Sequence, residues 1–178
     1  MEDITVITAI SHPLRRRIID RLLLHGPTQV GTFARMLDAQ VGSISHHLRM
    51  LQKAGVVEQV DDPSGDRRTS WWQLTRRSFT WSSEDFESPS DALLAREAQR
   101  ANVRNQLDRL QRWYRVSAAS EWEGFNTDTV AWATQDELLD LQARVGRMLD
   151  EWSSGIDRED GQERTPVYFF AHGFPTEV

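Results

Sequence analysis

Residues 43–58 read SISHHLRMLQKAGVVE, and this stretch decides the expected fold of the N-terminal half of the chain. Its apolar side chains Ile44, Leu48 and Leu51 recur at the spacing of one helical face, and His47 falls on the same side. Ala54-Gly55 is typical of a helix end, and the run 56–60 is strand-like. The stretch therefore predicts a helix, a tight stop and a strand.

Three further helices are predicted upstream of this stretch. Residues 4–10 form a short apolar helix, and HPLRRRIIDRLLLHGP at 12–27 predicts a helix that starts at Pro13 and is ended by Gly26-Pro27. VGTFARML at 30–37 predicts the next helix, with Thr28 as its N-cap. Residues 69–74 predict a second strand after the turn-rich tip 61–66. A group of helices followed by a hairpin describes a winged helix.

The helix in 43–58 divides its side chains in the way that a helix in a DNA major groove requires. Its outward residues are small at the start, where the backbone would approach closely, and long further on, where a side chain could reach a base or a phosphate. The candidate DNA-binding residues, including two arginines at the hairpin tip, are Gln40, Gly42, Ser43, Ser45, His46, Arg49, Arg67 and Arg68. The competing interpretation is a helical bundle with a solvated polar face.

Four segments together resemble the winged helix of ArsR-type transcriptional regulators: 12–27, 30–37, 43–58 and GDRRTSWWQL at 65–74. The resemblance extends over about residues 5–76. It implies a homodimer that binds double-stranded DNA, with the long helix after the hairpin in the dimer interface, and by analogy a repressor. The sequence departs from the family in having Asp38 where glycine is usual in the turn, Gln40 in place of a Ser/Thr cap, and His46 in place of a frequent arginine. It also lacks the cysteines of the family's metal sensors.

A long helix is predicted after a polar connection at 77–88. Ser88-Pro89-Ser90-Asp91 is a favourable helix start, and the helix is expected to run to about residue 118. Leu94, Ala98 and Ala101 lie on one side of this helix. A second set lies roughly opposite: Val103, Leu107, Leu110 and Tyr114. We expect both sides to be buried, against two different neighbours. The helix would then bridge the winged-helix module, or a partner's copy of it, to the C-terminal segment.

The last part of the chain predicts a small α+β cap. Residues 125–133 are strand-like, and residues 167–170 are a strand that is expected to pair with 127–133. Thr134-Gln135-Asp136-Glu137 is a capping box that opens another helix, ended by 153–155. The side chains that this helix is expected to bury are Leu138, Leu141, Val145, Met148, Leu149 and Trp152. The predicted fold is thus mainly α (α+β): a winged helix-turn-helix at 1–76, a linker at 77–88, and a long helix plus α+β cap at 89–178.

Composition excludes several classes of function. The 178 residues contain no cysteine and no apolar run of membrane-spanning length, so we expect a soluble, cytoplasmic protein without thiolate metal sites. None of the common nucleotide-binding or hydrolytic motifs is present, and the long helix has no histidine. We therefore expect neither an enzyme, nor a cofactor, nor a regulatory metal.

Charge is unevenly distributed: residues 1–82 carry a net +3 and residues 83–178 a net −9. The acidic half suits a face that keeps away from DNA, but it equally suits a different function, an effector-binding or protein-interaction module whose winged helix no longer binds DNA. Aromatic residues gather in this half, among them Trp113, Trp132 and Trp152. They either fill a small core or line a pocket for a small apolar or aromatic effector.

Overall fold

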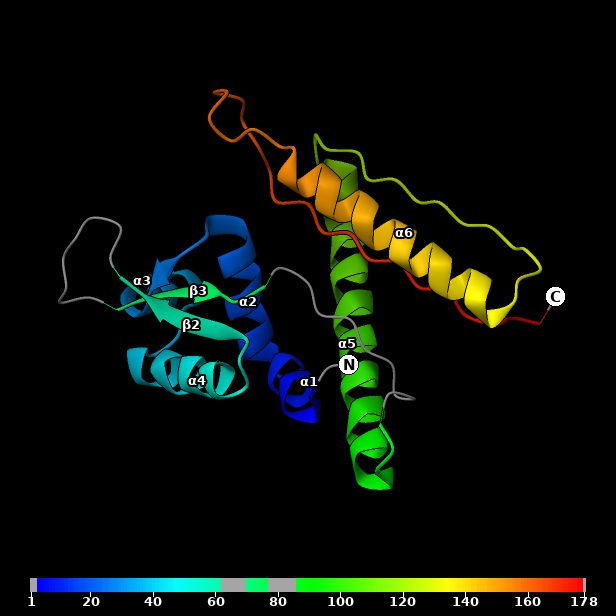
Figure 1. Ribbon diagram of the computed structural model, residues 1–178. Coiled ribbons are helices and arrows are strands. Elements are labelled where there is room, and N and C mark those ends of the chain that lie inside the picture. The colour runs from blue at the N-terminus through cyan, green and yellow to red at the C-terminus, as the bar shows by residue number, and fades with distance from the viewer. Residues whose placement is uncertain (1–2, 62–69, 77–85, 178) are drawn as a thin grey trace. The chain divides into compact units, whose positions relative to one another are not determined.

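The computed structural model describes residues 3–61, 70–76 and 86–177 of the chain. The protein is mainly helical, with a small antiparallel sheet of three strands (Figure 1), which confirms the predicted fold class. The chain forms two compact units, Met1–Arg115 and Val116–Val178. No helix in the described ranges combines the length and the apolar character needed to cross a membrane.

Helices α1 (Ile4–Ile10) and α2 (Pro13–His25) have the predicted bounds, and local capping explains both starts. The carboxylate of Asp3 accepts a hydrogen bond from the backbone N–H of Thr5 at 2.8 Å. Pro13 occupies the first turn of α2, where its missing N–H is not needed, and Nδ1 of His12 accepts from the N–H of Leu14 at 3.2 Å. Gly26 adopts a φ of 70°, which glycine tolerates best, and ends α2.

Helix α2 holds the C-terminal ends of two other helices through its arginines. The guanidinium of Arg15 donates to the carbonyls of Ala9, at the end of α1, and Thr8. Nη2 of Arg17 donates to the carbonyl of Leu37 at 3.2 Å, at the end of helix α3 (Val30–Leu37). The last carbonyls of a helix have no partner within it, so these bonds both satisfy them and fix where each helix ends.

The turn between α3 and helix α4 (Val41–Lys53) depends on one left-handed residue. Asp38 has a φ of 49°, a conformation that aspartate tolerates better than most non-glycine residues. Gln40 is the N-cap of α4 and makes no side-chain capping bond, in agreement with its departure from Ser/Thr. Gly55, with a φ of 71°, follows the end of α4 as predicted.

The prediction that Thr28 caps α3 is wrong, because Thr28 belongs to a strand that the sequence did not reveal. Strand β1 (Thr28–Gln29) pairs with β3, and Gln29 is the N-cap of α3 without a side-chain bond. The hydroxyl of Thr28 instead donates to the carbonyl of Gly26 at 2.9 Å. Two residues carry too little alternation to be recognised as a strand.

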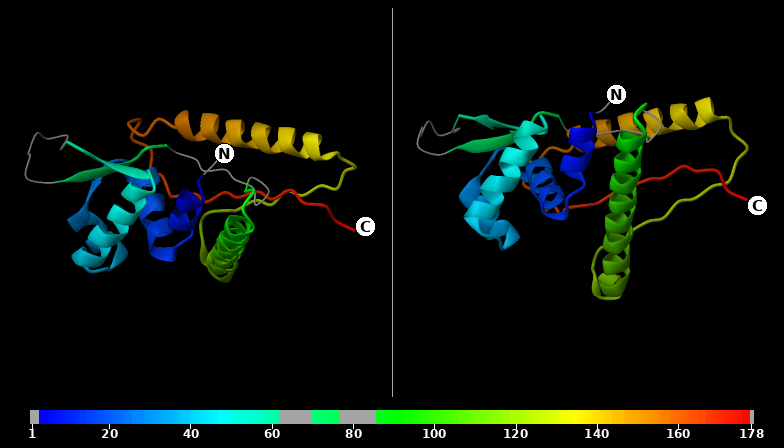
Figure 2. Two further views of the ribbon diagram at one scale, coloured as in Figure 1. Left: turned by 60° about the horizontal axis from the view of Figure 1, so that its bottom comes forward. Right: turned by 90° about the horizontal axis from the view of Figure 1, so that it is seen from below.

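The predicted hairpin is present as strands β2 (Val57–Val60) and β3 (Trp71–Leu74), and the sheet order is β1-β3-β2. The register pairs Val57 with Leu74 and Val60 with Trp71. Helices α1–α4 gather on one side of this hairpin (Figure 2). Residues 62–69, which hold the predicted tip, and residues 77–85 of the predicted linker lie outside the described residues.

One hydrophobic core joins α1–α4 to the sheet. Phe33, Ile18 and Ile44 are fully buried in it, and Trp72 is 4% exposed. The inward faces predicted for α2, α3 and α4 all contribute to this core, with Leu14, Leu23 and Val30 partly buried at its edge. Their 3.6-residue periodicity therefore reported true burial.

Helix α5 (Pro89–Val116) starts at the predicted residue, with the Ser88 hydroxyl accepting from the N–H of Asp91. A short 3-10 turn, η2 (Ser117–Ala119), follows it. The predicted burial of α5 is only partly right. Ala98 is buried, but Leu94, Leu107 and Tyr114 are 47%, 47% and 63% exposed. The expectation that both apolar sides are buried is wrong for the single chain.

Helix α6 (Gln135–Ser154) begins with the predicted capping box, in which Thr134 and Glu137 exchange hydrogen bonds between side chain and backbone. Gly155 ends it, as expected. The predicted burial of its apolar face is wrong, since no residue of α6 is buried. Leu138, Val145 and Leu149 are half-buried, while Leu141, Met148 and Trp152 are about half exposed.

The two strands predicted for the C-terminal cap are wrong. Residues 125–133 and 167–170 contain neither helix nor strand. The two segments do approach each other, since the rings of Phe125 and Phe169 lie 6.3 Å apart, but Phe125 is 79% exposed. β-Branched alternation alone does not form a strand where no buried face rewards it. Among its described residues, the unit Val116–Val178 therefore consists of helix α6, the short turn η2 and segments that are neither helix nor strand.

We predict that Leu48→Ala lowers the free energy of unfolding by about 2–5 kcal/mol, because Leu48 is fully buried and its loss leaves a cavity. Met50→Ala is the matched control on the same helix: Met50 is 40% exposed, and we expect a change of at most about 0.5 kcal/mol. Urea unfolding followed by circular dichroism measures both. Equal losses for the two variants would contradict the described packing of α4.

Candidate nucleic-acid interface

Helix α4 has one side in the core and the other side open. Ile44, Leu48 and Leu51 are 0% exposed, and through them the helix packs against α1, α2 and α3. Three apolar anchors over two turns fix both the axis and the rotation of the helix. The direction in which its remaining side chains point is therefore set by the core.

The predicted contact residues on α4 lie on the open side, at its start and middle. Gln40, Gly42, His46 and Arg49 are exposed, whereas Ser43 and Ser45 are half-buried. The structure brings these six together on one helix. Arg67 and Arg68, the two predicted contacts on the hairpin tip, lie outside the described residues.

Gly42 is not required by packing. A Cβ at this position would meet no atom within 4 Å, and its backbone is ordinary helix. Glycine within a helix costs up to about 1 kcal/mol relative to alanine. The structure of the single chain gives no reason for this cost. A ligand that approaches the backbone at the start of α4 would supply one.

Arg49 projects from the open side without a described partner. Within the described ranges its guanidinium makes no hydrogen bond or ion pair, unlike the structural arginines of α2. A guanidinium held by the core-fixed helix but otherwise unpaired can bind a guanine edge or a phosphate in two-pronged fashion. Lys53 adds a second exposed cation in the last turn of the same helix.

Two exposed apolar side chains on α4 were missed at the sequence level. Val41 is 56% exposed and Met50 is 40% exposed. Val41 lies three residues before Ile44 and so shares its helical stripe, which predicts burial, but it stands on the first turn, beyond the edge of the core. An apolar side chain at this place can contact a thymine methyl group.

Three histidines meet where α4 packs against the start of α2. The His47 ring lies 4.7 Å from the ring of His12 and 5.3 Å from that of His46. The sequence places His47 on the inward side of α4, but this residue is only half-buried, and its buried Nδ1 has no hydrogen-bond partner among the described residues.

Two histidines of the cluster, His12 and His47, are harder to protonate than a free histidine. Burial lowers the pKa of His47 below 6.5, and nearby His12, Arg15 and His46 act in the same direction. Burial also lowers the pKa of His12, with Arg15 contributing. The cluster is therefore compatible with the folded domain when its rings are neutral.

The three tryptophans weighed for an effector differ in exposure. Trp113 is half-buried on α5, Trp152 is 53% exposed on α6, and Trp132 is fully exposed. Across residues 3–61, 70–76 and 86–177, no group of three or more histidine or acidic side chains is placed to hold a metal ion.

Comparison with known proteins places a recognised domain on this part of the chain. Residues 10–60 match a family model described as a helix-turn-helix domain, and they span α2, α3, α4 and β2. An HTH-type transcriptional regulator of Mycobacterium tuberculosis, Rv2034, is 42% identical over 60 residues, which is 34% of this chain. The match spans 53% of that protein's length. Residues 10–60 thus resemble a helix-turn-helix domain, and strands β2 and β3 add a hairpin at its C-terminal end.

Solved structures with a likeness to a larger part of the chain are more distant. A mutant of ZitR from Lactococcus lactis, in its apo form, gives a TM-score of 0.38 at 12% identity, covering 80% of this chain and 83% of that one. A transcriptional regulator homologue from Pyrococcus horikoshii OT3 gives 0.37 at 20% identity, covering 57% and 87%. A mutant MarR from E. coli, complexed with operator DNA, gives 0.36 at 13% identity, covering 77% and 74%. Scores at this level do not establish a shared arrangement of the whole chain.

We predict that the free energy of unfolding falls as the pH drops below 6.5. The folded state disfavours protonated His12 and His47, whereas the unfolded chain accepts the protons at the ordinary pKa. The unfolded state then binds more protons, so stability rises with pH across this window and is lost on acidification. Urea unfolding at a series of pH values around 6.5 measures the slope.

His47→Gln is expected to flatten this pH dependence, because it removes one of the two resisting groups. His25→Gln is the matched control, since His25 is exposed at the far end of α2 and stands outside the cluster. A slope that is the same in His47→Gln and in the unaltered protein would show that the cluster does not carry the pH dependence.

Proposed function

We propose that the protein is a sequence-specific transcriptional regulator of the ArsR-like winged-helix type that binds double-stranded DNA as a homodimer. Helix α4 is the recognition helix, with Gln40, Gly42, Ser43, Ser45, His46 and Arg49 at the major groove. Arg67 and Arg68, predicted for the hairpin tip, would meet phosphates or a minor groove. Two copies related by a twofold axis would read half-sites about 10 base pairs apart, or a multiple of that.

The open side of α4 is the observation that carries this proposal. Its inner residues are fully buried, so the helix is held rigidly, while Gly42 is bare and Arg49 is unpaired among the described residues. If α4 only faced solvent, alanine at position 42 would make the helix more stable than glycine does, and nothing would require a residue without a side chain there. The helix-turn-helix match over residues 10–60 supports the same assignment.

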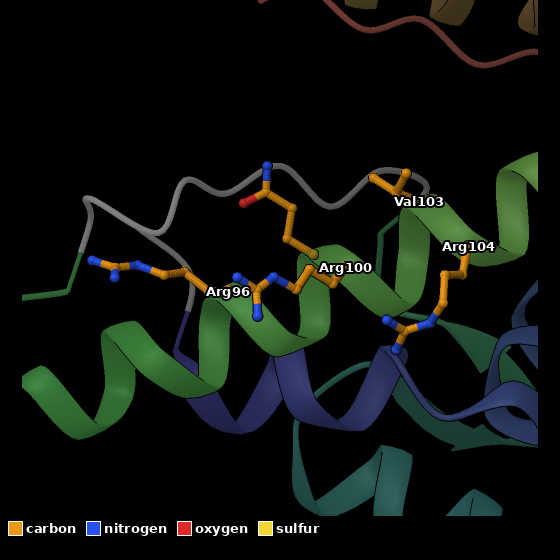
Figure 3. A pocket seen from close by; sticks show the side chains of 5 residues that line it. Arg96, Arg100, Val103 and Arg104 are labelled. Atoms are coloured by element: carbon orange, nitrogen blue, oxygen red, sulfur yellow. The ribbon is translucent and has the colours of Figure 1, made fainter.

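Helix α5 supports the homodimer. Leu93, Val103, Leu107, Leu110 and Tyr114 are separated by ten, four, three and four residues, which places them on one seam. Four of them are exposed, by 38–63%. Arg96 and Arg100 complete the seam toward the N-terminus and, with Gln99, Val103 and Arg104, line an open hollow of about 440 Å³ (Figure 3). A second copy of the same helix would bury this seam.

Repression and effector binding are finer parts of the proposal. The resemblance of residues 5–76 to ArsR-type regulators supports a repressor, and the lack of cysteine in the sequence argues against a thiolate metal sensor. Trp132 and Trp152 expose their rings, and with Trp113 they are the residues that we propose for a small apolar or aromatic effector.

A second candidate function is a protein-interaction module that no longer binds DNA. The unit Val116–Val178 favours it, because it carries 13 acidic residues against 4 arginines and exposes Phe125, Val130 and Trp132. The open side of α4 argues against it. DNA titration at two salt concentrations separates the two functions, since phosphate contacts make affinity fall steeply with salt.

We predict that Arg49→Ala weakens binding to a selected palindromic DNA by about 1–3 kcal/mol and relaxes preference at one base position. Selection from genomic fragments supplies the DNA, and gel-shift titration measures the affinity. Arg144→Ala, which removes an exposed arginine from α6, is the control and should leave affinity unchanged. Recovery of no enriched palindrome by the unaltered protein would refute the proposed function.

Gly42→Ala sharpens the same experiment, because stability and binding should move in opposite directions. The open space around Gly42 lets alanine stabilise the helix by up to about 1 kcal/mol, while the new methyl group intrudes between backbone and DNA. A variant that is more stable and binds DNA as before would show that α4 does not approach DNA at this point.

We predict that Leu107→Glu combined with Leu110→Glu converts the dimer to a folded monomer, because it places charges in the exposed α5 seam. Light scattering after gel filtration measures the mass, and circular dichroism checks the fold. Leu139→Glu on α6 is the control, since Leu139 is 51% exposed and lies outside the seam. An unaltered protein that is monomeric, or a double variant that stays dimeric, would contradict dimerisation through α5.

A further inference from the structure

Helix α5 has a second face, distinct from the exposed seam, that attaches it to its own winged helix. Ala95, Ala98 and Gln106 are buried, at 0%, 6% and 9% exposure. At 3.6 residues per turn these positions and Arg109 share one face, turned by more than about 100° from the seam of Leu107 and Tyr114. The attachment face is made of small and polar side chains, so it supplies little apolar area to hold the helix at one angle.

An ion pair on this face joins α5 to α2. Nη2 of Arg109 contacts the carboxylate of Asp20, whose other oxygen lies 3.4 Å from Nε of Arg16. The side chains of Arg109 and Asp20 are only 24% and 21% exposed. Nε of Arg109 is also held, at 3.4 Å from Oδ1 of Asn105 one turn earlier. One carboxylate thus receives guanidinium groups from two helices.

The same helix α2 fixes the position of the recognition helix. Arg17, three residues before Asp20, donates to the Leu37 carbonyl at the turn that leads into α4. Ile18 and Ile19 belong to the core that anchors α4. Helix α2 therefore contacts both the core that holds the recognition helix α4 and the proposed dimer helix α5.

We propose that Asp20 and Arg109 are positioning residues that set the angle between α5 and the winged helix, and thereby the half-site spacing that the dimer accepts. This inference rests on the proposed function. With half-sites about 34 Å apart, each recognition helix lies about 17 Å from the twofold axis. A rotation of α5 by about 10° would then move α4 by about 3 Å, close to the 3.4 Å rise of one base pair.

An ion pair suits this task better than it suits stabilisation. Removing two charges from water costs about as much free energy as their attraction returns, so such pairs add little to stability, but their directional hydrogen bonds hold one geometry. When Arg109 is replaced, the Asp20 carboxylate keeps Arg16 beside it, so we expect the spacing preference to change while the domain stays folded. A purely structural role would show the opposite.

The first experiment measures spacing on DNA. Duplexes carry the selected half-sites at the preferred separation or with one base pair added or removed, and Arg109→Met is compared with Arg109→Lys, which keeps the charge. The spacing preference is the ratio of the affinity at the preferred separation to the affinity at the altered one. We expect Arg109→Met to lower this ratio at least tenfold, and Arg109→Lys to retain most of it. Arg112→Met on the exposed side of α5 is the control. Equal weakening at every spacing, or no change, would overturn the inference.

The second experiment works without DNA. The chain has no cysteine, so Gln52→Cys on the exposed side of α4 gives one spin-label site per copy. Pulsed electron spin resonance measures the distance between the two labels in the dimer. We expect one narrow distance in the otherwise unaltered protein and a shifted or broadened one with Arg109→Met or Asp20→Asn.

These outcomes separate the inference from its premise. A dimer whose label distance is the same with and without Arg109→Met overturns the positioning role alone. A dimer with the expected distance change but without DNA binding overturns the proposed function and leaves the positioning role of Arg109 in place. A protein with no distance between copies overturns both.

Discussion

The structure depends on the complete burial of one side of α4. Ile44, Leu48 and Leu51 have no exposed surface, and burying side chains of this size contributes roughly 1.5–3 kcal/mol each. Because the three residues recur at the helical period, their burial fixes the rotation of the helix about its own axis as well as its position. Every outward residue, from Gly42 to Arg49, inherits its direction from that constraint. The polar surface of α4 is thus held in place by the apolar residues on the opposite side of the same helix.

Helix α2 converts this packing into a rigid frame. Its arginines satisfy the last carbonyls of α1 and α3, and its Asp20 receives Arg109 from α5. Consecutive residues Arg15, Arg16 and Arg17 each contact a different group, since helical geometry turns neighbouring side chains by about 100°. A run that reads as a basic cluster in the sequence is therefore mostly internal structure. Arg49, on another helix, is by contrast a cation with no partner among the described residues, and it can bind a ligand.

The C-terminal unit shows where pattern and structure part. The capping box at Thr134 and Glu137 is present, because capping involves atoms within one turn. The strands expected at 125–133 and 167–170 are absent, because a strand needs a partner at the right register and a face to bury. The apolar stripes of α5 and α6 are likewise real as patterns, yet in one chain Leu107, Tyr114 and Met148 remain exposed. Periodicity states that a face is apolar and leaves open what covers it.

Local chemistry written in the sequence determined the starts and ends of α1, α2, α4 and α6 and the start of α5. It also determined the inward apolar residues of the helix-turn-helix and the exposed residues Gln40, Gly42, His46 and Arg49. Prolines, caps, glycines and helical periodicity act over a few residues, so they can be recognised without knowing what lies further along the chain. Only the tertiary structure decided that Thr28 joins a strand, that Val41 and Met50 are exposed, that His47 meets His12, and that Asp20 receives Arg109. Each of these facts joins segments distant in sequence or marks the edge of the core, and no local pattern encodes such distances.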